Sequence, residues 1–206
     1  MHRHVFLRLE QAVEAYDTFF SPGPDGSGRV PISSLQKCTA TLRMLAYGEE
    51  AVRTNEYCRL GESTTFVELE KFTEAVINAF GADYLRSPNA TDLQRLLQIG
   101  AHRGLPGMMG SIDCMHWQWK NCPVGWRGMY QGRNGRATVI LEAVASQDLW
   151  IWHSFFGIPG SCNDLTVLHR SPIFDDMING RAPRVNYMVN GNHYNSGYYL
   201  TDGIYP

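Results

Sequence analysis

The chain has 206 residues, of which 44% are hydrophobic and 18% charged, and its formal net charge is −2. This length and apolar content suffice for one sizeable domain or two small ones, each with a buried core. Proteins that neutralise many phosphates usually carry an excess of basic residues, and the net charge of this chain shows no such excess. Any contact with nucleic acid therefore has to come from local basic patches.

Neither a membrane span nor a signal peptide is predicted. No run of eighteen apolar residues occurs, and charged residues are mixed into the apolar positions of the first helix. We therefore expect an intracellular protein. Its five cysteines are an odd number without a C-x-x-C pair, which argues against a disulfide framework. Cys114, His116 and Cys122 are close in sequence but lack the paired spacing of a zinc site.

The first hundred residues have the periodicity of helices. Apolar residues recur every three or four positions, and Pro- or Gly-containing breaks separate the periodic stretches. The break at residues 22–26 carries acidic residues but not the spacing of a calcium loop, so we interpret it as a turn. Ser33 and Gln36 have the spacing of a capping box, and Ser63 is a further candidate N-cap. We predict helices at residues 5–16, 33–48, 49–59, 63–77 and 92–99.

Two of these predicted helices have the layout of a helix-turn-helix. The helices at residues 49–59 and 63–77 are joined by a short turn that contains Gly61. In a helix-turn-helix the second helix enters the major groove of DNA. Arg53, Arg59 and Lys71 are then the candidate DNA contacts, and an ordinary helical packing unit is the alternative.

The second half of the chain is predicted to be rich in strands. The segment Gly104-Leu105-Pro106-Gly107 resembles a linker, so we place a boundary there, between a helical region at residues 1–104 and a second domain at residues 105–206. The fold class is α+β. A turn at residues 147–148 makes the first three strands an antiparallel meander, and a turn at residues 190–195 separates the last two. We predict strands at residues 109–114, 138–144, 149–156, 185–189 and 198–201, with a helix at 165–168.

Two aspartates are candidate metal ligands. Asp113 ends the first predicted strand, and Asp202 follows the last one with glycine after it. If these strands are neighbours, both carboxylates emerge at one edge of the sheet, where they could hold the Mg²⁺ or Mn²⁺ ions used in phosphoryl transfer. Strand-ending aspartates also commonly begin turns. Asp164 competes for the second role, although Asn163 or Asp164 is also a natural helix cap.

A local basic and aromatic stretch follows Asp113. No acidic residue lies between Asp113 and Glu142. Arginine suits phosphate oxygens and aromatic rings can stack on unpaired bases, so this stretch is a candidate for contact with DNA. For its tryptophans, packing in the protein interior is the simpler interpretation. The basic residues are Lys120, Arg127, Arg133 and Arg136, and the aromatic ones include Trp117, Trp119, Trp126 and Tyr130.

Several segments together resemble the plant PIF/Harbinger transposases. The most specific are Gly107-Met108-Met109-Gly110-Ser111-Ile112-Asp113-Cys114-Met115-His116-Trp117 and Leu200-Thr201-Asp202-Gly203-Ile204-Tyr205-Pro206. The resemblance implies a helix-turn-helix region and a ribonuclease H-like domain that cuts and rejoins DNA with Mg²⁺ or Mn²⁺. It also implies that Asp113 and Asp202 are the first and second catalytic aspartates. Asp164 matches an aspartate in the family's Gly-Ser-x-x-Asp segment.

The sequence departs from this pattern at its end. The family places a third acidic ligand, a glutamate, on a later helix, whereas the sequence stops at Pro206, four residues after Asp202. We therefore expect an incomplete ribonuclease H-like domain with impaired cleavage. The alternative is a non-catalytic DNA- or chromatin-associated protein, and a degenerate product without function is a third possibility. The resemblance further implies a nuclear location, or a cytoplasmic one without a partner, and a separate Myb-like DNA-binding partner.

Overall fold

The computed structural model describes residues 1–21, 23, 32–48, 50–182 and 184–205. It divides the chain into two compact units, Met1–Asp83 and Tyr84–Pro206. The division lies before the expected boundary at residues 104 and 105, because the helix that precedes the expected linker packs against the first strand of the sheet. No helix in the described parts of the chain is both long and apolar enough to cross a bilayer.

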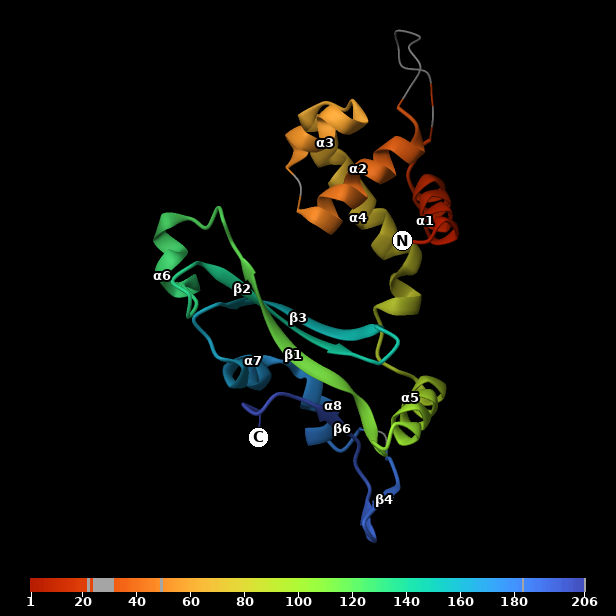
Figure 1. Cartoon of the computed structure of the whole chain (residues 1–206), viewed down its shortest axis with the longest axis vertical. Helices are drawn as coiled ribbons and strands as arrows, with labels where there is room; N and C mark the ends of the chain where they lie inside the picture. The colour runs from red at the N-terminus through yellow and green to blue at the C-terminus, as the bar shows by residue number, and fades with distance from the viewer. Residues whose placement is uncertain (22, 24–31, 49, 183, 206) are drawn as a thin grey trace. The chain divides into compact units, whose positions relative to one another are not determined.

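The first unit is helical, as predicted. Its helices are α1 (Arg3–Tyr16), α2 (Ser34–Tyr47), α3 (Ala51–Cys58) and α4 (Glu62–Tyr84), of which the last reaches one residue into the second unit (Figure 1). Their apolar positions form buried clusters, since residues three and four apart share a helix face. One cluster has the buried members Val13, Phe20, Cys38, Phe72 and Ala75. A second cluster brings Cys58 of α3 and Leu60 together with Ala40 of α2.

One of the two predicted N-caps is confirmed. The Ser33 hydroxyl accepts a hydrogen bond from the Gln36 amide N–H at 3.2 Å, and the Gln36 side chain accepts one from the Ser33 amide N–H, which completes the capping box of α2. Gly48 ends this helix in the left-handed conformation, with φ of 62°. The prediction for Ser63 is wrong, because α4 already begins at Glu62 and Ser63 lies within its first turn.

The second unit is built around a mixed four-stranded sheet in the order β3-β2-β1-β6. The strands β1 (Met108–Gln118), β2 (Thr138–Ala145) and β3 (Ile151–Pro159) form the predicted antiparallel meander. The short strand β6 (Tyr198–Leu200) then pairs with β1 in parallel. Mixed helix and sheet in this arrangement confirm the α+β class.

Helices flank this sheet. Helix α5 (Ala90–His102) packs against β1. A Cβ on Gly100 of this helix would come within 2.9 Å of the Leu105 carbonyl oxygen, so the close approach of the chain to Gly100 requires glycine. Helix α7 (Asp164–Arg170) buries Val167 against Ile140 and Ile158. The connection between β3 and β6 also contains the 3₁₀ turn η2 (Pro172–Phe174) and the helical turn α8 (Asp175–Ile178).

A second sheet, of two strands, lies where a single strand at residues 185–189 was predicted. The predicted strand at 185–189 is shortened to β4 (Tyr187–Val189) and pairs with β5 (Asn192–Tyr194) rather than with the main sheet. The turn predicted at residues 190–195 is therefore too long, because residues 192–194 form β5. Asn190 and Gly191 both have positive φ, 50° and 80°, which is the geometry of an Asn-Gly hairpin turn.

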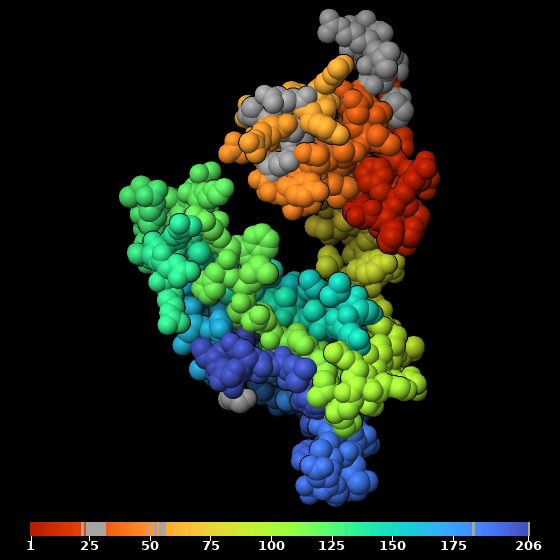
Figure 2. Space-filling view, viewed as in Figure 1, coloured from red at the N-terminus to blue at the C-terminus, as the bar shows by residue number. Residues whose placement is uncertain are grey.

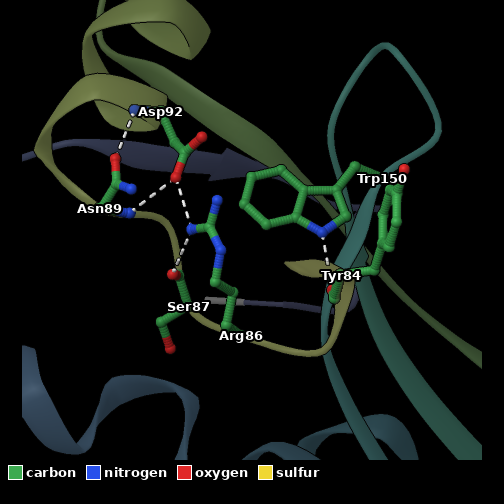
Figure 3. Close-up of polar contacts among 6 residues, drawn as sticks. All are labelled: Tyr84, Arg86, Ser87, Asn89, Asp92 and Trp150. Carbon is green, nitrogen blue, oxygen red and sulfur yellow. Dashed lines mark hydrogen bonds and ion pairs between the residues drawn. The ribbon is translucent and has the colours of Figure 1, made fainter. Parts of the chain in front are cut away.

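The amino terminus of α5 is fixed by a polar cluster (Figure 3). The Asn89 side chain accepts a hydrogen bond from the Asp92 amide N–H at 2.9 Å, and the Asp92 carboxylate accepts one from the Asn89 amide N–H at 3.0 Å. The same carboxylate accepts from Arg86 at 2.6 Å, which lowers the pKa of Asp92. The Arg86 guanidinium lies 5.1 Å from the ring centroid of Trp150, whose indole N–H donates to the Tyr84 carbonyl.

Candidate metal centre

Asp113 lies on the open side of β1. Its neighbour Ile112 is buried and Cys114 is half-buried, whereas the Asp113 side chain is exposed, as expected when successive side chains alternate between the two faces of a strand. Its carboxylate accepts a hydrogen bond from the Cys114 amide N–H at 2.8 Å. The expectation that Asp113 ends its strand is wrong, because β1 continues to Gln118 through its pairing with β2.

Asp202 follows the strand that pairs with the strand of Asp113. The parallel pairing of β6 with β1 ends where Leu200 lies opposite Ser111. Asp202 is two residues beyond Leu200 in the chain, and Asp113 is two residues beyond Ser111 on β1. Asp202 is also exposed, and its carboxylate accepts a hydrogen bond from the Ile204 amide N–H at 3.2 Å. The predicted neighbourhood of the two acid-bearing segments is confirmed.

Asp164 is placed differently. It is the first residue of α7, where Asn163 is the N-cap and accepts a hydrogen bond from the Thr166 amide N–H at 2.8 Å. Its carboxylate interacts with the Cys114 thiol, which points away from the face that carries Asp113. Asp164 therefore lies on the helix-covered side of the sheet, apart from the Asp113 side chain.

Cys114 and Tyr205 form a polar contact on that covered side. The Cys114 Sγ lies 3.3 Å from the Tyr205 Oη. Burial raises the pKa of the Cys114 thiol to about 11, and the nearby carboxylates of Asp164 and Glu142 add to this effect. Burial also raises the pKa of the Tyr205 hydroxyl. Both groups are therefore neutral near pH 7 and fix the chain directly after Asp202.

The acid pair supplies some of the ligands that a divalent cation requires. Oxygen atoms of exposed carboxylates are the donors that Mg²⁺ and Mn²⁺ prefer. Within the described residues, however, no group of three or more His, Cys, Asp or Glu side chains is gathered closely enough to hold a metal ion. Asp113 and Asp202 have the donor chemistry of such ligands, but the described residues do not gather a complete set around them.

A buried polar network was missed by the sequence reasoning. The Glu142 carboxylate on β2 is completely buried and lies 3.3 Å from Nε2 of His153 on β3. The same nitrogen lies 3.1 Å from the hydroxyl of Ser171, which follows α7. The sequence did contain a signal for this network. Glu142 lies between Ile140 and Val144 at the buried positions of β2, where an acidic side chain needs a polar partner.

The candidate DNA-contacting residues are divided between the two units. In the helical unit, Arg53 is exposed on α3 and Arg59 is the exposed residue that follows it, with φ of 55°. Lys71 is engaged within the protein, because its ammonium group lies 2.5 Å from the Asp17 carboxylate. In the sheet unit, all four basic residues of the segment at positions 119–137 are exposed, namely Lys120, Arg127, Arg133 and Arg136.

The aromatic residues of the same segment mostly pack on one another. The ring centroids of Trp119 and Tyr130 are 5.0 Å apart in an edge-to-face arrangement, and Trp126 stacks on Tyr130 at 6.4 Å. The prediction that the tryptophans pack within the protein holds only in part. Trp117 is 54% exposed on β1, and Trp126 is 53% exposed although its ring packs on Tyr130.

The fold and site define a mixed α+β unit whose four-stranded sheet carries the exposed Asp113 on β1, with the exposed Asp202 two residues after the parallel neighbour β6. A sequence model of the plant transposon protein family matches residues 82–206. Since this match covers more than half of the chain and all of the sheet unit, the chain belongs to the plant transposon protein family. No curated protein and no solved structure matches the chain.

Proposed function

We propose that this chain is a transposase-derived protein of the PIF/Harbinger class whose sheet unit has a ribonuclease H-like core. The order β3-β2-β1-β6 supports this, because three antiparallel strands are followed by a helical crossover and a strand parallel to the first. The family match over the same residues agrees with a transposon origin. The activity that follows is metal-dependent cleavage and strand transfer of DNA.

The observation that carries this proposal is the parallel pairing of β6 with β1, because Asp113 lies on β1 and Asp202 follows β6 by two residues. Both carboxylates are exposed and are oriented by backbone N–H groups, so neither needs to leave a buried partner to bind a cation. They would hold Mg²⁺ or Mn²⁺. When bound, such an ion supplies Lewis-acid stabilisation of charge on phosphoryl oxygens. The role of the two side chains is to position the ion and the substrate phosphate at this edge of the sheet.

Titration of manganese into the purified chain by calorimetry tests the proposal. We expect Asp113→Asn and Asp202→Asn each to weaken binding at least tenfold, because each removes an anionic oxygen ligand while keeping the side-chain shape. Asp83→Asn is the matched control, since it removes an exposed carboxylate from the helical unit. Absence of manganese binding by the parent chain, or an equal loss of affinity in all three variants, would contradict the proposed metal site.

A non-catalytic DNA- or chromatin-associated protein is the second candidate. It is favoured by one observation, that the described residues gather no third protein ligand beside the acid pair. In this case the helix-turn-helix formed by α3 and α4 would contact DNA through Arg53 and Arg59, in the nucleus and together with a Myb-like partner. Gel-shift binding that needs these two arginines but neither metal nor Asp113 would support this candidate over the nuclease.

A further inference from the structure

A hollow of about 270 Å³ lies at the outer end of the β1–β2 pair. Its lining includes three cationic side chains, Lys120, Arg127 and Arg136, together with the amides of Gln118 and Gln131. We propose that this hollow binds a backbone phosphate of a nucleic-acid strand. The inference rests on the proposed function, to which it adds a contact with the substrate that needs no metal.

The charge of the hollow is uncompensated. No acidic residue occurs in the sequence between Asp113 and Glu142. The ion pairs found among the described residues involve none of the three cations that line the hollow. A concave site lined by one sign of charge concentrates counter-ions of the opposite sign. The guanidinium groups of Arg127 and Arg136 also present the planar fork of donors that matches phosphate oxygens.

The walls of the hollow are held in place before any ligand arrives. The Arg127 Nε donates a hydrogen bond to the Cys122 carbonyl at 3.3 Å, which orients its guanidinium. The Trp119 amide N–H donates to the Ala137 carbonyl at 2.9 Å, and the Trp119 ring packs on Tyr130. The segment forms a distinct lobe on the sheet unit, coloured green in Figure 2. Such preorganisation lowers the entropic cost of binding.

The hollow is near enough to the acid pair for one nucleic-acid strand to reach both. Gln118, which lines the hollow, is five positions beyond Asp113 along β1, a distance of roughly 17 Å at about 3.3 Å per residue. This corresponds to about five nucleotides of a B-form strand at 3.4 Å each. Between them Trp117 is exposed, and it shares the face of Asp113 because side chains two or four residues apart point the same way. A base can stack on this ring.

The test is fluorescence anisotropy with a labelled 15-nucleotide single-stranded DNA in buffer that contains EDTA. We expect Arg127→Gln and Arg136→Gln each to weaken binding about tenfold, as for a lost hydrogen bond to a charged group. Arg184→Gln, an exposed arginine outside the hollow, should change it less than twofold. Arg133→Gln, in the same loop but not in the lining, should fall between these values. Urea unfolding of each variant confirms that it is folded.

Two outcomes overturn the inference. Equal weakening by Arg127→Gln and Arg184→Gln would mean diffuse attraction without a built site. Absence of oligonucleotide binding by the parent chain would also overturn it, even if inorganic phosphate quenches the Trp119 fluorescence, because the hollow would then be a small-anion site. EDTA removes divalent ions, so this assay does not depend on the metal site, and Asp83→Asn in the helical unit should leave binding in EDTA unchanged. Failure of the metal proposal, seen by manganese calorimetry, is therefore distinguishable from failure of this one.

Discussion

The Glu142 carboxylate on β2 lies 3.3 Å from the His153 imidazole on β3, and the Ser171 hydroxyl contacts the same imidazole nitrogen. Glu142 is fully enclosed, and its second oxygen has no hydrogen-bond partner among the described residues. Removing the partner of a buried carboxyl group leaves that group unsatisfied. Loss of His153 should therefore destabilise the sheet unit.

His153→Ala should destabilise the sheet unit by about 3 kcal/mol, because it leaves a buried carboxylate unpaired. Urea unfolding followed by tryptophan fluorescence measures this directly, since all five tryptophans lie in the sheet unit. In a Glu142→Gln background the same substitution should cost about 1 kcal/mol, as for an ordinary hydrogen bond. If His153→Ala lowers the free energy of unfolding equally in both backgrounds, the contact between Glu142 and His153 has no ionic contribution to stability.

Glu68 gives the helical unit a stability that depends on pH. Its side chain is fully buried in α4, neither oxygen has a partner among the described residues, and burial raises its pKa to about 7. The native state therefore holds a proton that the unfolded state releases near its ordinary pKa of 4.5. Stability is fully present below about pH 4.5 and decreases as pH rises to about 7, by up to about 3 kcal/mol.

Thermal unfolding followed by far-ultraviolet circular dichroism between pH 4.5 and 8 checks this prediction. Glu68→Gln keeps the shape but cannot ionise, so its melting temperature should vary less over this range. The ion pair of Asp17 with Lys71 does not interfere, because it lowers the pKa of Asp17 below its ordinary value of 3.8. An identical pH profile for parent and variant would show that Glu68 does not titrate in this window.

Gly107 is constrained by both its backbone and its surroundings. It has φ of 88°, and a Cβ would come within 2.2 Å of the Tyr187 ring. Gly104 has a similar φ of 79° but open space around it. Gly104→Ala should therefore cost only about 1 kcal/mol for its conformation, whereas Gly107→Ala should cost about 1–3 kcal/mol more for the clash. Urea unfolding compares the two.

Gly107→Ala should also weaken manganese binding. The Gly107 carbonyl accepts a hydrogen bond from the Tyr198 amide N–H at 3.0 Å, which joins the start of β1 to the start of β6. Displacement of this contact shifts Asp202 relative to Asp113. Calorimetry of a folded Gly107→Ala protein should show weaker binding than Gly104→Ala, and equal affinities would contradict the link.

Asn89 should account for about 1 kcal/mol of stability through its cap on α5. Asn89→Ala removes the acceptor for the Asp92 amide, whereas Asn89→Ser retains one. Urea unfolding followed by tryptophan fluorescence should rank the proteins parent, Asn89→Ser and Asn89→Ala in decreasing stability. A loss as large in Asn89→Ser as in Asn89→Ala would mean that the cap hydrogen bond contributes nothing.

Local patterns predicted most helices and the meander. The capping box at Ser33 and the strand at residues 138–144 depend on a few neighbouring residues, and the structure confirms both. The turn predicted at residues 147–148 is confirmed, but β3 begins at Ile151 rather than at residue 149, because Leu149 adopts φ of 65° and is 84% exposed although its side chain is apolar. The Asn190-Gly191 pair is typical of a two-residue hairpin turn, but residues 192–194 were assigned to the turn rather than to β5.

The candidate site could be predicted only in part. The apolar strand before each acid indicated Asp113 and Asp202, but their adjacency depends on β6 joining β1, which no local pattern encodes. Asp164 could not be separated from the pair by sequence, because its placement on the covered side depends on how α7 packs. The hollow near Arg127 likewise depends on a loop conformation rather than on a periodic pattern.

The parallel pairing of β6 with β1 has a kinetic consequence. Ser111 and Leu200 meet across about ninety residues of chain, and β6 contributes only three residues to the sheet. Ordering so long a loop is entropically costly, whereas the meander forms from near neighbours. The acid pair is therefore the last part of the sheet to assemble and the first to open, so amide hydrogen exchange at Tyr198 should report the open state before the meander exchanges.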